Sequence, residues 1–114
     1  MKQIKAYMRK TMLGSTITEL EKNGARDITI SSVDAIGELS DLEMDRWHVI
    51  RKYQERYSQI AKMEIVCLDK EVRGFVDVIK KHGHTGERGD GRIFVFPVEL
   101  AANIRTGEEG DEAL

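Results

Sequence analysis

Hydrophobic and polar residues alternate along residues 2–9 and again along residues 27–36. A period of two residues is typical of a half-buried β-strand, so we expect a strand at each place. Between these segments the hydrophobic residues fall three and four positions apart, in a stripe from Leu13 to Leu20. That spacing predicts a helix of about three turns, with Gly24 as its C′ residue. The first part of the chain therefore predicts β-α-β.

The second half of the chain repeats this order. Residues 62–68 predict a third strand, and Asp69 follows it as a candidate N-cap. The next hydrophobic residues recur at i, i+3, i+4 and i+7, which predicts a second helix that ends at Gly83 as its C′ residue. These residues are Val72, Phe75, Val76 and Ile79. Residues 92–96 then predict a fourth, mainly buried strand, which Pro97 should end.

Two β-α-β units of similar size predict an α+β fold, the ferredoxin-like split β-α-β sandwich. It has one antiparallel sheet with two helices on one face. With 114 residues we expect a single domain over residues 1–114. The other face of the sheet would be exposed to solvent in a monomer. The pattern therefore favours a symmetric oligomer in which these faces pack against one another.

The two units are joined by residues 37–59, the most charged and aromatic part of the chain. An insertion of this length predicts a protruding loop that becomes ordered on a partner. A short helix is an alternative, because Trp47, Ile50 and Tyr57 fall near one helical stripe. Trp47 either anchors a partner or packs on its own loop, and the sequence leaves both open.

A glycine-rich segment, residues 82–92, separates the second helix from the fourth strand and holds four of the ten glycines. Glycines bare successive backbone N–H groups and permit positive φ, so such a loop can cradle an anion. An ordinary turn is the alternative. His82 and His84 are candidate metal ligands, although two histidines without further ligands are more typical of solvated or capping residues.

The composition of the chain argues against several classes of protein. The net charge of −2, with both signs interspersed, gives no electrostatic footprint for nucleic acid. Cys67 is the only cysteine and lies in an apolar run, so we expect a buried thiol and no disulfide. The absence of a signal-like or membrane-spanning apolar stretch predicts a cytoplasmic protein without direct membrane insertion. No nucleophile with an oriented base is apparent, so we do not expect an enzyme.

Two motifs carry a family resemblance. The run Thr85-Gly86-x-x-Gly89-Asp90-Gly91-Arg92-Ile93-Phe94-Val95-x-Pro97-Val98 resembles the B-loop signature TGxxGDGKIFVxPV of the PII signal-transduction family. Residues 105–111, Arg-Thr-Gly-Glu-Glu-Gly-Asp, resemble its C-terminal element RTGExG. The chain is identified as a divergent, PII-like member of this family of nitrogen-regulatory proteins.

The resemblance implies a homotrimer that binds adenine nucleotides in the clefts between subunits. The B-loop, about 82–92, would come from one protomer and the C-terminal loop, about 102–114, from the next. Residues 37–59 would be the T-loop, of which residues 38–58 contact a target, either a membrane transporter or a metabolic enzyme. The implied nucleotide-binding residues are Thr29, Gly37, Glu64, Val66, Gly86, Gly89, Asp90, Gly91, Arg92, Asn103 and Arg105.

The chain departs from the family pattern where the family holds charge. Glu38, Leu39 and Ile60 replace the arginine, glutamine and lysine associated with the γ-phosphate, Mg²⁺ and 2-oxoglutarate, so we expect no 2-oxoglutarate sensing. Glu87 and Asn103 replace further cations. These departures from the family pattern predict a site that binds ADP, AMP or a cyclic adenine nucleotide at least as well as ATP.

The T-loop also lacks the family's tyrosine-bearing stretch YRGAEY, so regulation by uridylylation and the usual ammonium-channel target are not expected. Two other classes of function stay open from the residues alone. One is a metal-binding trimeric ferredoxin-like protein, which requires His48, His82 and His84 to converge. The other is an enzyme with a degenerate site.

Overall fold

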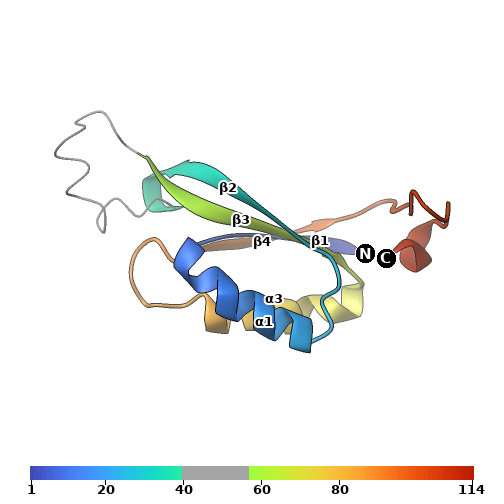
Figure 1. Ribbon diagram of the computed structural model, residues 1–114, viewed down its shortest axis with the longest axis horizontal. Coiled ribbons are helices and arrows are strands. Elements are labelled where there is room, and N and C mark those ends of the chain that lie inside the picture. Colours follow the sequence, from blue (N-terminus) through green and yellow to red (C-terminus); the bar gives the residue numbers. More distant parts are fainter. Residues whose placement is uncertain (40–56) are drawn as a thin grey trace.

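A computed structural model describes residues 1–39 and 57–114. Within these residues, strands and helices follow the predicted order (Figure 1). The elements are β1 (Lys2–Met8), α1 (Leu13–Lys22), β2 (Ile28–Ile36), β3 (Tyr57–Cys67), α3 (Val72–His82) and β4 (Gly91–Pro97). Short 3-10 helices stand between them, namely η1 (Lys10–Met12), η2 (Gly37–Leu39), η3 (Asp69–Glu71) and η4 (Gly110–Ala113).

The strands form one sheet in the order β2-β3-β1-β4, and every neighbouring pair is antiparallel. Helices α1 and α3 pack against each other on one face of this sheet (Figure 1). The α+β, ferredoxin-like arrangement with two helices on one face is therefore confirmed. Both β2 and β4 are edge strands, and this position decides how far their side chains are buried.

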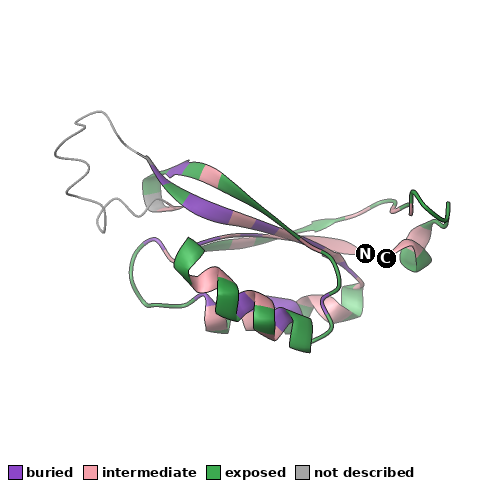
Figure 2. Ribbon diagram, in the orientation of Figure 1, coloured by how far each residue is buried: buried purple, intermediate pink, exposed green. Residues whose placement is uncertain are grey.

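The core lies between the helices and the sheet, as the purple segments of Figure 2 show. Ile4, Ala6 and Met8 point into it from β1, and Cys67 is buried at the end of β3. The hydrophobic residues predicted for both helices also face this core. Because burial disfavours the thiolate, the pKa of Cys67 is raised. The period-two and period-3.6 patterns therefore assigned the core-facing residues of β1, α1 and α3 correctly.

The two helices end differently. After α1, the N–H of Ala25 donates to Leu20 O (2.9 Å) and that of Gly24 donates to Glu21 O (3.1 Å). Gly24 has φ 94°, so the predicted C′ glycine is confirmed as part of a Schellman motif. Gly83, by contrast, is the C-cap of α3 with φ −88°, so its prediction as a C′ residue was wrong.

The start of α3 also differs from the prediction. The chain first forms the 3-10 turn η3, and α3 begins at Val72 with Glu71 as its N-cap. Asp69 is therefore not the N-cap of the helix. Its carboxylate instead accepts the N-terminal amine of Met1 at 2.9 Å, and that ion pair lowers the pKa of Asp69.

Two predictions about the strands need correction. Strand β3 begins at Tyr57 rather than at residue 62, because pairing with β2 over Val33–Ile36 continues the ladder into a polar stretch. Strand β4 is not mainly buried, since Phe94 and Phe96 are each 42% exposed. Both phenylalanines lie on an edge strand and face away from the helices.

The face of the sheet opposite the helices carries aromatic side chains. The rings of Tyr7 and Phe94 meet edge to face with centroids 6.2 Å apart, and Lys5 Nζ lies 5.2 Å from the centroid of Phe96. The residues predicted to contact a target, 38–58, fall mostly outside the described part of the chain, and so does Trp47.

Candidate functional site

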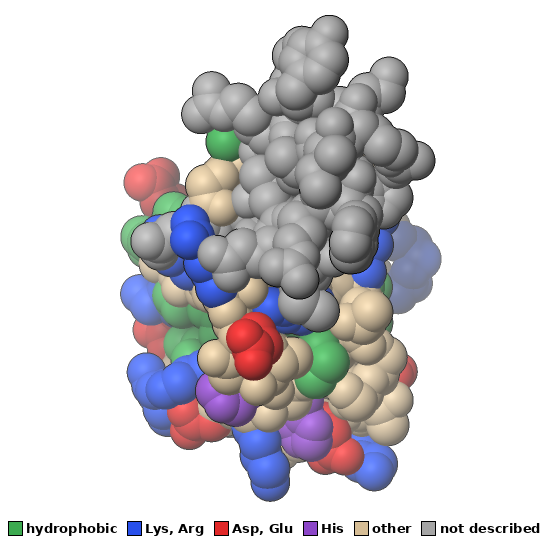
Figure 3. All heavy atoms as spheres, turned by 90° about the vertical axis from the view of Figure 1, so that its left-hand side faces the viewer, with side chains coloured by type: hydrophobic (Ala, Val, Ile, Leu, Met, Phe, Trp, Pro, Cys, Tyr) green, Lys and Arg blue, Asp and Glu red, His purple; other side chains and the backbone are tan. Residues whose placement is uncertain are grey.

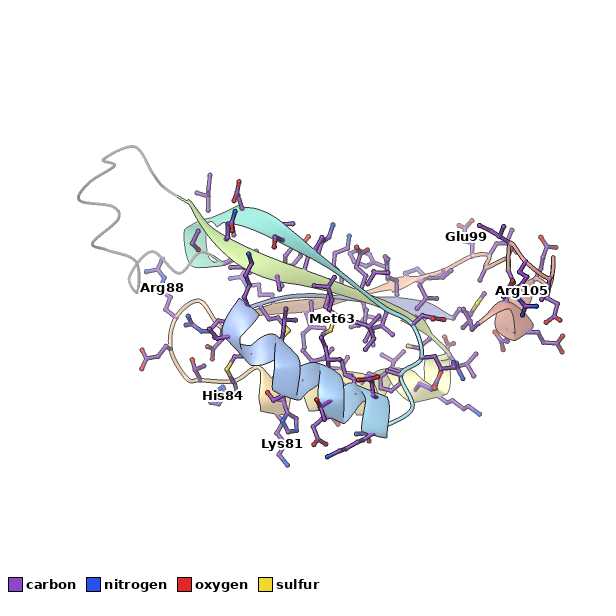
Figure 4. The ribbon with its side chains drawn as sticks, viewed as in Figure 1. Met63, Lys81, His84, Arg88, Glu99 and Arg105 are labelled. Atoms are coloured by element: carbon purple, nitrogen blue, oxygen red, sulfur yellow. The ribbon has the colours of Figure 1, made fainter. Side chains whose placement is uncertain are left out.

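The predicted site residues lie at two opposite ends of the protomer. The B-loop, residues 82–92, connects α3 to β4, whereas the C-terminal loop, residues 102–114, follows β4 at the other end of the sheet (Figure 1). Figure 4 shows the same separation at the level of side chains, with His84 and Arg88 at one end and Arg105 at the other. One protomer therefore does not bring all the predicted site residues together.

Glycines determine the path of the B-loop. Gly86, Gly89 and Gly91 have φ of 91°, 100° and 114°, a region that other residues rarely adopt. A Cβ atom at Gly91 would also lie 1.7 Å from Tyr7 O, because β4 begins there against β1. Glycine is therefore required at these positions for two reasons: the positive φ of the loop, and the close approach of Gly91 to the backbone of β1.

The Asp90 carboxylate is the centre of a hydrogen-bond network in this loop. Its Oδ2 accepts the backbone N–H of Thr85 (2.8 Å) and of Gly86 (2.9 Å), and its Oδ1 accepts the Thr85 hydroxyl and Arg9 Nε (3.0 Å). Burial alone would raise the pKa of Asp90, but these hydrogen bonds outweigh it and hold the pKa well below its usual value. Asp90 is therefore ionised and fixes the loop. The N–H of Gly86, one of the implied nucleotide-binding residues, therefore donates to Asp90 within the loop in this conformation.

A cavity of about 550 Å³ lies beside the B-loop, between α3 and β4. Its wall contains three predicted site residues, Asp90, Gly91 and Arg92, together with Lys80 and His84. Side chains of Lys, Arg and His lie on this end of the molecule, below the grey region of Figure 3, with acidic side chains between them. The arrangement combines an apolar floor with basic groups, which suits an anionic ligand.

A second cavity, of about 210 Å³, brings together Thr29, Glu64 and Val66 from β2 and β3. Thr29 and Glu64 are paired across the two strands, and Thr29 Oγ1 donates to Glu64 O at 3.4 Å. The Glu64 carboxylate accepts Gln3 Nε2 at 2.8 Å and lies 3.6 Å from Lys62 Nζ. These contacts fix the polar side chains of Thr29 and Glu64 in the cavity wall, beside the apolar Val66. Three of the implied nucleotide-binding residues thus share one cavity.

The C-terminal loop is organised by Asn103. Its Oδ1 accepts the backbone N–H of Arg105 (2.9 Å) and of Thr106 (3.1 Å), while its own N–H donates to Glu108 O (2.8 Å). The bridge between Ala102 and Glu109 closes the loop into a short hairpin. Asn103, which the resemblance places where the family has arginine, therefore shapes the turn that carries the exposed Arg105.

The remaining predicted positions lie near the base of the T-loop. Gly37 has φ 91° and opens η2, which lies against β4. Ile60 is 2% exposed and pairs with Val33, so it presents no polar group. Glu87 is exposed in the B-loop. The side chain of Glu38 lies outside the described part of the chain.

Neither a metal cluster nor a membrane span is found in the described residues. Among residues 1–39 and 57–114, no three histidine, cysteine, aspartate or glutamate side chains are grouped so as to hold an ion. His48, which the metal hypothesis requires, is outside this part. In the same residues no helix has the length and apolar character needed to cross a membrane.

Neither Arg9 nor the role of the Asp90 side chain was apparent from the sequence. Arg9 comes directly after an alternating strand, where a basic residue is typical of a solvated position. Its side chain is nevertheless only 10% exposed and reaches the B-loop. No local pattern marks a contact between residues that are 81 positions apart.

Comparisons with known proteins agree with this architecture. The family model described as Nitrogen regulatory protein P-II matches residues 1–108. The chain is 34% identical over 113 residues to nitrogen regulatory protein GlnK2 of Haloferax mediterranei, covering 99% of this chain and 90% of that protein. It is 36% identical over 114 residues to nitrogen regulatory protein P-II of Microchaete diplosiphon, covering all of both chains.

A similar likeness extends to a plant protein, the nitrogen regulatory protein P-II homolog of Arabidopsis thaliana, with 32% identity over 97% of this chain and 56% of that one. The matches to the two microbial relatives run the full length of the chain and include both loops. The chain therefore belongs to the PII family of nitrogen regulatory proteins.

Proposed function

We propose that this protein is a non-enzymatic, cytoplasmic regulator that binds an adenine nucleotide between subunits of a homotrimer. The observation that carries the proposal is the separation of the predicted site into two halves. The B-loop half, with Asp90 and Arg92, lies at one end of the protomer, and the half with Thr29 and Arg105 lies at the other. A second copy of the chain is the simplest source of the missing half.

The chemistry of the two halves suits the two ends of a nucleotide. The backbone N–H groups of Gly89 and Gly91 in the glycine-rich turn and the guanidinium of Arg92 favour phosphate. The other cavity pairs a polar wall, Thr29 and Glu64, with the apolar Val66, which favours an adenine ring. Arg105, from the loop beside it, adds a further cation. The open, aromatic face of the sheet supplies apolar surface for the subunit contacts of such a trimer.

The preferred ligand is ADP, AMP or a cyclic adenine nucleotide, bound at least as well as ATP. An acid at position 38 facing a γ-phosphate would disfavour ATP by about 1 kcal/mol or more, which is about fivefold or more in affinity. Ile60 is buried and apolar where a lysine would pair with 2-oxoglutarate. The nucleotide signal is passed to a transporter or metabolic enzyme through residues 38–58, without 2-oxoglutarate sensing.

Calorimetric titration with ATP, ADP, AMP and cyclic AMP, each with and without 2-oxoglutarate, tests the ligand. We expect ADP and AMP to bind at least as tightly as ATP, with no effect of 2-oxoglutarate. Much tighter binding of ATP that 2-oxoglutarate strengthens further would contradict this preference. Titration with Zn²⁺ and Cu²⁺ on the same samples tests the metal-binding alternative.

A subunit-mixing experiment tests the shared site. Arg92→Ala disables the B-loop half and Arg105→Ala the other half, so trimers of either variant alone should bind ADP weakly. In randomly mixed trimers, about one cleft in four combines two intact halves. Recovery of about a quarter of the tight sites after unfolding and joint refolding supports the proposal. No recovery would contradict a site that combines Arg92 of one subunit with Arg105 of another.

A further inference from the structure

The side chain of Arg9 is nearly enclosed although it follows directly on a strand. It stands at the junction of β1 and η1 in an extended conformation (φ −65°, ψ 135°) and is only 10% exposed. Arginine is rarely buried to this degree unless its guanidinium is paired. The groups that accept hydrogen bonds from the Arg9 guanidinium therefore indicate the role of this side chain.

Arg9 holds the B-loop at two points. Its Nε donates to Asp90 Oδ1 at 3.0 Å, and its Nη2 donates to the backbone carbonyl of Arg88 at 2.7 Å. Two bonds from one planar guanidinium fix orientation as well as distance. They join residues about eighty positions apart, so the loop is attached to the end of β1 in the sheet.

The Asp90 carboxylate extends this attachment to the first turn of the loop. Its second oxygen accepts the backbone N–H groups of Thr85 and Gly86, so a single side chain fixes peptide groups on both sides of the turn. Arg9 balances the negative charge that these bonds concentrate at Asp90. Without Arg9, the carboxylate would lose its one charged hydrogen-bond donor among the described contacts.

We propose that Arg9 is a positioning residue of the nucleotide site, which holds the B-loop through Asp90 and the Arg88 carbonyl in its phosphate-binding conformation. The inference rests on the proposed function for the identity of the ligand. Arg9 itself does not bind the ligand, because its guanidinium is enclosed and directed at the loop. Its effect on affinity is therefore confined to the part of the ligand that the loop contacts.

The experiment compares Arg9→Gln with Lys10→Gln, which removes the same charge one residue away. Lys10 is exposed and its Nζ donates to Gln59 Oε1 at 3.1 Å rather than to the B-loop. Calorimetry measures the affinity of each variant for ADP and for adenosine, and amide hydrogen exchange measures protection at Thr85 and Gly86. Arg9→Lys keeps the charge but loses the planar two-point contact.

We expect Arg9→Gln to weaken ADP at least tenfold, to change adenosine less than twofold, and to lose protection at Thr85 and Gly86. Arg9→Lys should recover part of both losses, and Lys10→Gln should resemble the unmodified protein. Equal weakening of ADP and adenosine, unchanged protection, or lost protection with unchanged ADP affinity would each overturn the inference.

The outcomes separate this inference from the proposed function. If the unmodified protein binds no adenine nucleotide, the proposed function fails, and with it the role of Arg9 at a nucleotide site. Hydrogen exchange in Arg9→Gln then still decides whether Arg9 holds the loop.

Discussion

The B-loop and the C-terminal loop contain the same six-residue pattern, Thr-Gly-Glu-x-Gly-Asp, at residues 85–90 and 106–111. In both, the threonine hydroxyl accepts the N–H of the glutamate two residues on, at 3.1 Å in the first and 3.2 Å in the second. The glycines have positive φ in both, 91° and 100° against 78° and 79°. The repeated sequence therefore produces the same local turn twice.

The two loops differ in what their central polar side chain reaches. In the B-loop this side chain is Asp90, which is joined to Arg9 at the end of β1. In the C-terminal loop it is Asn103, whose described side-chain bonds go to Arg105 and Thr106 within the same turn. The Asp90 side chain thus joins the first loop to the sheet, whereas the described side-chain bonds of Asn103 stay within the second loop.

This difference suits a site shared between subunits. A loop attached to its own sheet presents a ligand-binding surface before any partner arrives. A turn whose bonds are internal keeps its shape, but its position is determined by the surface that it binds. Substitutions in the B-loop should therefore lower global stability, and the matched substitutions in the C-terminal loop should have smaller, local effects.

The largest difference is expected between Gly91→Ala and Gly107→Ala. Both positions need positive φ, but a Cβ atom at Gly91 would also lie 1.7 Å from Tyr7 O, whereas nothing lies within 4 Å of one at Gly107. Gly91→Ala should lower the free energy of unfolding by about 3 kcal/mol or more, and Gly107→Ala by about 1 kcal/mol. Urea titrations at a fixed protein concentration measure both. Similar losses would show that the two loops are equally attached.

Sequence patterns predicted the elements of this fold where one face of an element is buried. The stripe of Leu13, Ile17 and Leu20 and the alternation of β1 both located the core, because burial imposes their periodicity. The same reasoning failed for β4, where the run from Arg92 to Phe96 was interpreted as mainly buried. A hydrophobic run does not reveal whether its strand lies inside a sheet or at its edge.

The candidate site was predictable only in its local chemistry. Glycine density and the family signature indicated the B-loop, since positive φ is a property of single residues. The bond from Arg9 to Asp90 depends on how β1 and the loop meet after folding, and no spacing in the sequence encodes that. The Asn103 turn is local and could have been predicted, since asparagine side chains often accept backbone N–H groups in turns. At this position the family pattern indicated only the loss of an arginine charge.

The second largest difference is expected between Asp90→Asn and Asp111→Asn, the aspartates at the same position of the two patterns. Asp90→Asn replaces one carboxylate oxygen by an NH2 donor, so either the two backbone N–H groups or Arg9 lose their acceptor, and the charge that faces Arg9 is lost in both cases. This should lower the free energy of unfolding by about 2 kcal/mol. Asp111 is exposed, so its substitution should cost about 0.5 kcal/mol or less. Chemical denaturation at pH 7 compares them.

The effect of Asp90→Asn should also depend on pH. Because the pKa of Asp90 is lowered in the folded protein, its carboxylate contributes stability above the ordinary pKa, and this contribution decreases as pH falls below about 4. The stability difference between the unmodified protein and Asp90→Asn should therefore be constant from pH 7 to 5 and shrink below pH 4. A difference that grows as pH falls would contradict this account.

A smaller effect is expected at Asn103. Asn103→Ala removes the Oδ1 that accepts the Arg105 and Thr106 N–H groups, so the turn should open locally at a cost of about 1 kcal/mol. Asn103→Asp keeps an acceptor at this place and should preserve the turn. Amide exchange at Arg105 and Thr106 reports the local effect, and protection at Thr85 serves as the internal control. A simultaneous loss of protection at Thr85 would mean that the two loops are coupled.

The smallest difference tests the shared threonine turn itself, with Thr85→Val and Thr106→Val. Valine keeps the shape of threonine but removes the hydroxyl that accepts the glutamate N–H in each loop. The Thr85 hydroxyl additionally donates to Asp90, so its loss should cost about 1.5 kcal/mol, against about 0.5 kcal/mol for Thr106. Thermal unfolding of the two variants side by side measures this. Equal losses would mean that the bond from the Thr85 hydroxyl to Asp90 adds nothing to the stability of the B-loop.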